Sequence, residues 1–203
     1  MNKTAPLSQL VVTRSPSITW SDERLVRECL KGNEEAWAAL IDKYKNLIFS
    51  IPYRYGATKE DAADVFQAVC LELFSELSNL RRIGSLRSWL ITVAAHKSYH
   101  WKQKLRRQSN QEGANIALED LNEKIPAASP EWIAEAERDQ MVREAVAHLP
   151  SRCGELVRLL FYEQPPVPYS EVAQRLGLAL GSIGFIRGRC LRRLQKLLED
   201  MGF

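Results

Sequence analysis

The segment YSEVAQRLGLALGSIGFIRGRCLRRL, residues 169–194, decides the fold predicted for the C-terminal part of the chain. Ala173, Gly177 and Ile183 follow one another at intervals of four and six residues. In two helices joined by a tight turn, a small residue lets the helices approach and a glycine takes the positive φ of the turn. A β-branched residue then anchors the second helix. The spacing therefore predicts a helix-turn-helix.

The second helix of this pair separates apolar from basic side chains. Ile183, Ile186, Cys190 and Leu194 are expected to face inward, and Ser170 and Ser182 to cap the two helices. The side chains left to solvent are mostly arginines: Arg187, Arg189, Arg192 and Arg193. An arginine-lined helix suits the DNA major groove, because guanidinium groups reach guanine O6 and N7 or phosphate. The alternative is a helical hairpin with a solvated basic face.

A second segment, VAAHKSYHWKQKLRR at residues 93–107, combines aromatic and basic side chains and contains no acid. Unpaired bases stack on aromatic rings while phosphates attract cations, so this composition predicts a surface for single-stranded nucleic acid. Alternatively, Tyr99 and Trp101 are half-buried packing residues on a solvated basic helix. His96 and His100 stand four residues apart but have no third ligand nearby, so no metal site is expected.

Charge is distributed unevenly along the 203 residues, although the net charge is only +3. All eight charged residues between positions 81 and 107 are basic, whereas residues 112–139 hold eight acids and two bases. The tail becomes basic again from Arg187. Two basic blocks on either side of an acidic one indicate two anion-binding surfaces on a jointed chain.

Helical spacing of apolar residues dominates the rest of the chain, and no strand alternation is convincing. We expect an all-α fold with an N-terminal helical bundle and a C-terminal helix-turn-helix domain joined by a flexible acidic linker. The expected boundaries are a disordered tail at 1–20, a first domain at 21–107, the linker at 108–130 and a second domain at 131–203. Within the first domain, Pro52 should kink or end a helix, Thr58 should cap the next one, and Gly84 and Ser85 should open another.

Several function classes are not expected. Cys29, Cys70, Cys153 and Cys190 form no Cys-x-x-Cys pair, and we interpret them as reduced thiols of a cytoplasmic protein. The first twenty residues predict no signal peptide, and no apolar run is long enough to span a membrane. No catalytic triad, phosphate loop or carboxylate pair is apparent, so neither an enzyme nor a cofactor is expected.

Three segments in this order resemble a bacterial RNA polymerase sigma factor of the extracytoplasmic-function (ECF) group of the sigma-70 family. They are EDAADVFQAVCLELF at 60–74, GSLRSWLITVAAHKSYHWKQKLRR at 84–107, and the segment from HLPSRCGELV to CLRRL at 148–194. The resemblance covers nearly everything from Asp22 to Leu198. It implies that residues 21–107 are sigma-70 region 2 and that residues 131–203 are region 4.

The resemblance also implies roles for individual residues. Core polymerase binding, on the clamp coiled coil of its largest subunit, falls to Asp61, Asp64 and Gln67. Opening of the minus-ten element and capture of its non-template strand fall to His96, Lys97, Tyr99, His100, Trp101, Lys102, Lys104, Arg106 and Arg107. Contact with the minus-thirty-five element falls to Ser182, Gly184, Phe185, Arg187, Gly188, Arg189, Arg192 and Arg193.

The chain departs from the family pattern at several of these positions. Asparagine is usual in place of His96, and aspartate often stands in place of His100. Gly184, Phe185 and Gly188 stand where polar or basic residues often contact DNA, which leaves Arg189 as the best candidate for reading a base.

The implied partners are core RNA polymerase and promoter DNA, both duplex and melted. An anti-sigma factor is usual for the group, although no residue shows one. The alternative function is a stand-alone helix-turn-helix regulator that binds duplex DNA as a dimer. The N-terminal half favours the sigma factor, because it pairs an acid-free aromatic helix with an acidic helix suited to a basic partner.

Overall fold

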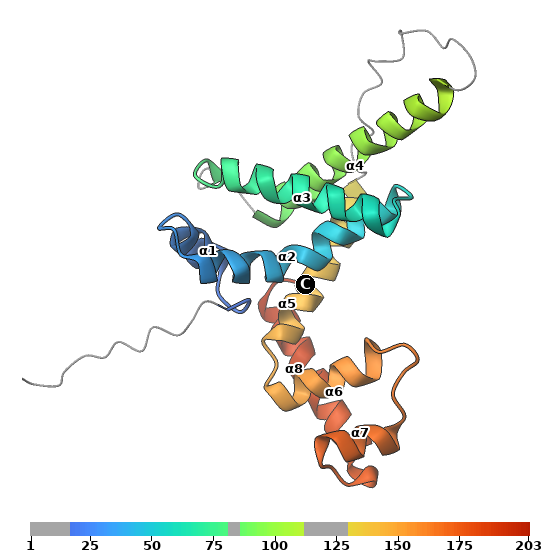
Figure 1. Ribbon diagram of the computed structural model, residues 1–203. Helices are drawn as coiled ribbons and strands as arrows, with labels where there is room; N and C mark the ends of the chain where they lie inside the picture. The colour runs from blue at the N-terminus through green and yellow to red at the C-terminus, as the bar shows by residue number, and fades with distance from the viewer. Residues whose placement is uncertain (1–16, 81–85, 112–129) are drawn as a thin grey trace, which may run out of the picture.

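The computed structural model describes residues 17–80, 86–111 and 130–203, and its regular elements are all helices (Figure 1). The prediction of an all-α fold is confirmed. Residues 1–16 of the expected tail, residues 112–129 of the expected linker, and Gly84 and Ser85 lie outside the described residues. Within the described ranges, no helix is both long and apolar enough to cross a membrane.

Four helices pack together in the N-terminal part, with α2 in contact with the other three. They are α1 (Asp22–Cys29), α2 (Glu34–Arg54), α3 (Lys59–Glu76) and α4 (Leu86–Gln111). Their shared core includes the fully buried side chains of Leu40, Leu47, Ile48 and Leu90. The four helices therefore form the expected bundle, which fixes the directions of α3 and α4.

Local signals in the sequence place the ends of these helices as predicted. Helix α2 ends two residues after Pro52, which lacks the N–H for a helical hydrogen bond and weakens the last turns. Thr58 caps α3, since its Oγ1 accepts from the Asp61 backbone N–H at 3.2 Å and an Asp61 carboxylate oxygen accepts from the Thr58 N–H at 3.2 Å. This reciprocal capping box satisfies two backbone donors that the helix itself cannot pair.

Helix α5 (Pro130–Ala147) lies between the N-terminal bundle and the C-terminal helices (Figure 1). It contacts α2 and α4 on one side and α6 and α8 on the other, and it contributes Ala136 to the N-terminal core. A buried carboxylate fixes this contact, because Glu144 pairs with Arg87 at 3.1 Å and with Lys43 at 3.7 Å. A helix of the C-terminal half is thus docked on the first domain through charges from α2 and α4.

The C-terminal helices enclose a second, smaller core. They are α6 (Ser151–Phe161), α7 (Tyr169–Leu176), the 3-10 turn η3 (Leu180–Ser182) and α8 (Ile183–Asp200). Gly177 ends α7 with a φ of 61°, and Ala173 and Ile183 are buried, as the spacing predicted. Arg152 of α6 supports this turn by donating to the Leu176 carbonyl at 3.0 Å.

The predicted serine caps are wrong. Helix α7 begins at Tyr169, one residue before Ser170, so Ser170 is already inside the helix. Ser182 does precede α8, but its hydroxyl donates to the Ala179 carbonyl at 2.7 Å instead of capping the helix. Pro168 occupies the N-cap position of α7 and offers no side-chain acceptor, and the η3 turn takes up the Ser182 hydroxyl.

The expectation of four reduced cysteines is also wrong. Cys153 of α6 and Cys190 of α8 form a disulfide, whereas Cys29 and Cys70 are free. The packing of α6 against α8 places the two Cα atoms 5.4 Å apart, within the range that a disulfide bridges. The two cysteines are 37 residues apart in the sequence, so no short motif could signal their pairing.

Candidate nucleic-acid interface

Helix α4 is buried in its first half and more exposed in its second half. Its first half is held in the core by Leu90, Ile91 and Ala94, which are fully buried. The buried Ser98 hydroxyl donates to the Ala94 carbonyl at 2.7 Å, so this polar group is satisfied within the helix. Beyond that point the helix emerges from the bundle, as the green end of α4 shows in Figure 1.

The basic residues predicted to attract phosphate lie mostly on this emerging half. Lys104, Arg106 and Arg107 are exposed, and Lys102 is half-buried. Lys97 differs from them because its ammonium group pairs with Glu72 of α3 at 2.5 Å. The cationic surface of α4 is therefore centred on residues 102–107.

The two aromatic residues of this helix are half-buried. Tyr99 accepts a hydrogen bond from the Gln103 side chain at 2.8 Å. Trp101 packs against the N-terminal core, and its indole Nε1–H donates to the Asp61 carboxylate at 3.0 Å. Each ring thus combines a packed part with a partly accessible one, and stacking on unpaired bases stays a prediction for both.

The contact between Trp101 and Asp61 joins two residues assigned to separate sites. Asp61 was predicted to bind polymerase and Trp101 to bind DNA, but here the same carboxylate caps α3 and receives the indole N–H. The Thr58 side chain, the Thr58 backbone N–H and the Trp101 indole all lower the pKa of Asp61. The residues are 40 positions apart, and no pattern in the sequence signals the contact.

His96 and His100 contact each other on the outer side of α4. Their Nε2 atoms are 2.9 Å apart, so one ring must present an unprotonated nitrogen to the other. Partial burial and the neighbouring His100 lower the pKa of His96. Among the described residues, no cluster of three or more histidine, cysteine or carboxylate groups could hold a metal ion.

Helix α3 presents a stripe of polar and apolar residues that sequence analysis found only in part. Asp64 and Gln67 are exposed, as a binding role requires, and both stay predictions as polymerase contacts. Leu71 and Phe74 follow at helical spacing and are 70% and 69% exposed. The Phe74 ring lies on the surface, 5.4 Å from the Trp37 ring. We call these four residues the α3 stripe.

Helix α8 carries its arginines outward. Arg187, Arg189, Arg192 and Arg193 are exposed, as are Gly184 and Phe185, whereas Ser182 and Gly188 are half-buried. Ile183 and Cys190 are buried and Ile186 and Leu194 half-buried, so the predicted division of faces is confirmed.

Two of these arginines have defined neighbours. Arg187 donates to the Tyr169 hydroxyl at 2.7 Å, which ties α8 to the start of α7. The Arg189 guanidinium lies 5.8 Å from the centre of the exposed Phe185 ring. Both contacts hold guanidinium groups near the beginning of α8, where a recognition helix would meet base edges.

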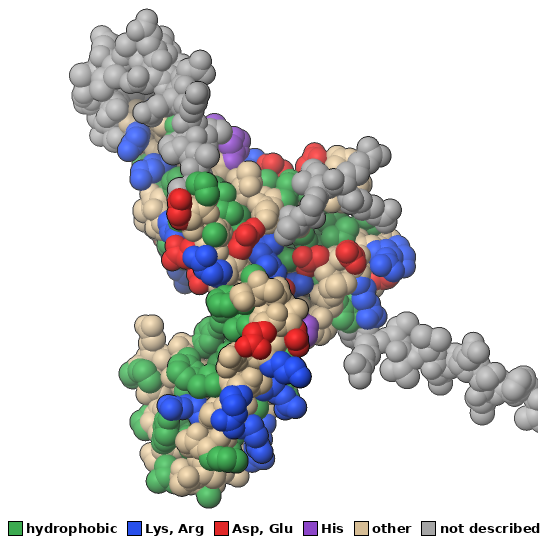
Figure 2. All heavy atoms as spheres, turned by 180° about the vertical axis from the view of Figure 1, so that it is seen from behind, with side chains coloured by type: hydrophobic (Ala, Val, Ile, Leu, Met, Phe, Trp, Pro, Cys, Tyr) green, Lys and Arg blue, Asp and Glu red, His purple; other side chains and the backbone are tan. Residues whose placement is uncertain are grey.

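The C-terminal part of the molecule has a basic surface. In Figure 2, Lys and Arg side chains gather on the lower, C-terminal part of the molecule, whereas acidic and basic side chains are mixed on the upper part. Such a basic patch attracts the nucleic-acid backbone irrespective of sequence.

A comparison with known families matches part of this geometry. Residues 40–108 match the Sigma-70 region 2 family, a span that runs from α2 through α3 to the emerging half of α4. The match includes the α3 stripe and the whole basic segment of α4. This part of the chain is therefore similar to Sigma-70 region 2, and the similarity supports a sigma factor of the sigma-70 family.

Proposed function

We propose that this chain is an RNA polymerase sigma factor of the ECF group, which binds core polymerase and directs initiation by recognising and melting promoter DNA. It acts as a binding subunit rather than as an enzyme, and it acts in the cytoplasm, where it meets the chromosomal DNA. The observation that carries the proposal is the pairing of the α3 stripe with the acid-free half of α4 inside one Sigma-70 region 2 domain.

The α3 stripe fits a helical partner with basic and apolar side chains. Asp64 supplies a charge, Gln67 a hydrogen-bonding group, and Leu71 and Phe74 the apolar area. Large exposed apolar side chains cost solvation unless a partner covers them, so an unpaired face of this kind indicates an interface. In the proposed function, this face meets the clamp coiled coil of the polymerase.

The emerging half of α4 fits a melted DNA strand. Phosphates would lie along Lys104, Arg106 and Arg107, and the partly accessible rings of Tyr99 and Trp101 would accept bases that have lost their stacking partners. Because Asp61 orients Trp101, docking on polymerase and strand capture would be linked through one hydrogen bond.

Helices α7 and α8 fit the upstream duplex as a helix-turn-helix, with α8 in the major groove. Arg189 is the candidate for a base contact, while Arg192 and Arg193 suit phosphates. The alternative, a stand-alone regulator, would also use α8 but gives no reason for the Sigma-70 region 2 match or for the α3 stripe.

The proposal is tested by measuring the affinity of the chain for core polymerase. The double variant Leu71→Ser/Phe74→Ser should weaken association by at least about 2 kcal/mol, the range of interface hot spots. Phe161→Ser is the matched control, because Phe161 is a similarly exposed aromatic residue on α6 and should leave polymerase affinity unchanged. Fluorescence anisotropy of the labelled chain with purified core enzyme would measure both. Equal affinities of the double variant and the natural chain would contradict the proposed docking face.

A further inference from the structure

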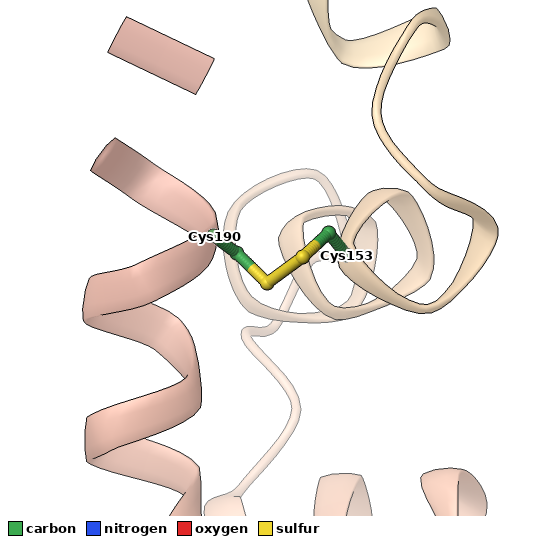
Figure 3. Close-up of a disulfide and its surroundings, with 2 residues drawn as sticks. All are labelled: Cys153 and Cys190. Atoms are coloured by element: carbon green, nitrogen blue, oxygen red, sulfur yellow. A yellow bond between two sulfur atoms is a disulfide. The ribbon is translucent and has the colours of Figure 1, made fainter. Parts of the chain in front are cut away.

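The disulfide between Cys153 and Cys190 ties α6 to the helix proposed to read DNA (Figure 3). Cys190 is 1% exposed and belongs to the second core, whereas Cys153 is only half-buried. Arg189, the candidate base-reading residue, directly precedes the buried sulfur. The bond therefore holds α8 against α6 at Cys190, next to the exposed arginines of α8.

The covalent loop encloses α7, the turn and the start of α8, whereas Arg192 and Arg193 follow it. Its 37-residue separation contains α7, the Gly177 turn, η3 and the first part of α8. A cross-link of this length strongly restricts the unfolded chain. Forming or breaking one bond thus changes the stability of the elements that carry Arg187 and Arg189.

The second core is small enough to depend on this bond. Among the described residues it has six buried members, one of which is Cys190, against 22 in the N-terminal core. A small core rarely stabilises a domain without a cross-link, metal or partner. The C-terminal helices also contact α5, and they do so mainly through α6 and α8.

Cys29 and Cys70, the two free cysteines, are poor nucleophiles. Burial raises the pKa of Cys29 to about 11, and burial also raises the pKa of Cys70. Both therefore hold little of the thiolate that attacks a disulfide. Neither forms a pair in the structure.

We propose that Cys153 and Cys190 form a redox-sensing site, in which oxidation by a small-molecule disulfide locks the C-terminal helices in their DNA-binding form and reduction releases them. The inference rests on the proposed function, which places the chain in a reducing compartment, where disulfides usually serve sensing rather than permanent support.

The chemistry is two successive thiol–disulfide exchanges. The half-buried Cys153 thiolate attacks one sulfur of the small-molecule disulfide and releases one small thiol. The Cys190 thiolate then attacks the Cys153 sulfur of this mixed disulfide and releases the second small thiol. The two cysteines lose two electrons and two protons in total, and the small disulfide is reduced to two thiols.

Unfolding of the two domains can be followed separately with two optical signals. All five tryptophans pack against the N-terminal core, so their fluorescence reports unfolding of that domain only. Far-UV circular dichroism reports the helices of both domains. The full chain is equilibrated in buffers with varied ratios of oxidised to reduced glutathione, alkylated, and analysed by mass spectrometry for the state of each cysteine.

Cys153 and Cys190 should convert together to free thiols at a ratio of oxidised to reduced glutathione within the range tested. Reduction should then move an early circular-dichroism transition to lower denaturant and leave the tryptophan transition in place. Cys153→Ser and Cys190→Ser should abolish the response, and Cys153→Ser keeps the buried Cys190 in case Cys190→Ser does not fold. Cys70→Ser, which removes a free thiol of the other domain, is the control and should respond as the natural chain does.

DNA binding is measured in parallel with a random-sequence duplex pool. If one tenth of the reduced C-terminal domains is folded, the reduced chain binds about tenfold more weakly than the oxidised chain. A disulfide that persists at every ratio would overturn the proposal, as would a reduced form with unchanged unfolding and DNA affinity. A redox-dependent transition in a chain that binds no core polymerase would support the redox site and contradict the proposed function.

Discussion

Replacing Glu144 by alanine removes the carboxylate that docks α5 on the N-terminal bundle. Its side chain is only 9% exposed, and its two oxygens meet Arg87 at 3.1 Å, Gln140 at 3.2 Å and Lys43 at 3.7 Å. Lys43 would keep Asp22, which lies 2.6 Å away. Within the described part of the chain, Arg87 would keep no acidic partner, and its buried Nε already lacks a hydrogen bond there.

The expected loss in the free energy of unfolding depends on Arg87, which would lose its partner, and on Lys43, which would keep one. Removing one partner of a buried ion pair costs about 3–5 kcal/mol, because the remaining charge stays desolvated. Since Lys43 remains paired, we expect the lower end of that range, about 3 kcal/mol. For a chain of this size, that corresponds to a fall of about 6–12 °C in the melting temperature.

Glu135→Ala is the matched control on the same helix. Glu135 also pairs with an arginine, Arg54, at 2.7 Å, but its side chain is 53% exposed. Water screens such a pair, so its loss should cost about 0–1 kcal/mol. Guanidinium unfolding followed by tryptophan fluorescence would compare the two variants. Equal destabilisation by Glu144→Ala and Glu135→Ala would refute the buried-network argument.

Three further outcomes are expected. Trp101→Ala should impair promoter opening by about 1–3 kcal/mol more than polymerase binding; normal opening, measured by permanganate reactivity of unpaired thymines, would make Trp101 a packing residue. Arg189→Ala should cost about 1–3 kcal/mol on upstream duplex with a fixed guanine, and an equal loss on scrambled DNA, measured by anisotropy, would indicate a phosphate contact instead. Because its surroundings lower the pKa of His96 below 6.5, the folded chain should lose stability as the pH falls through that value and keep it above. Urea unfolding across this range should be flatter for His96→Gln, and an identical slope would contradict the assignment.

Much of the helical architecture was predictable because its signals are local. The Thr58 cap, the end of α2 near Pro52 and the positive φ at Gly177 each depend on a few neighbouring residues. The inward and outward sides of α8 follow from helical spacing alone. These features are set by steric limits and hydrogen bonding within single elements, so the sequence displays them directly.

The missed features join segments that are far apart in the chain. The Trp101–Asp61 bond, the docking of Glu144 on Arg87 and the Cys153–Cys190 disulfide depend on how whole helices pack. The surface position of Phe74 has a related cause: its spacing fits an apolar stripe, but α2 and α4, which pack on α3, leave its ring 69% exposed. Periodicity gives the relative orientation of side chains on one helix, not the width of the face that its neighbours bury.

Transcription with purified core polymerase tests the account's central claim most directly. Abortive initiation would be measured on a pool of upstream DNA fragments from the host, with and without the chain in its oxidised form. The proposed function predicts initiation at discrete fragments that depends on the chain and is lost in the Leu71→Ser/Phe74→Ser variant. Absence of chain-dependent initiation, together with tight binding of the chain alone to duplex DNA, would contradict it and favour a stand-alone regulator.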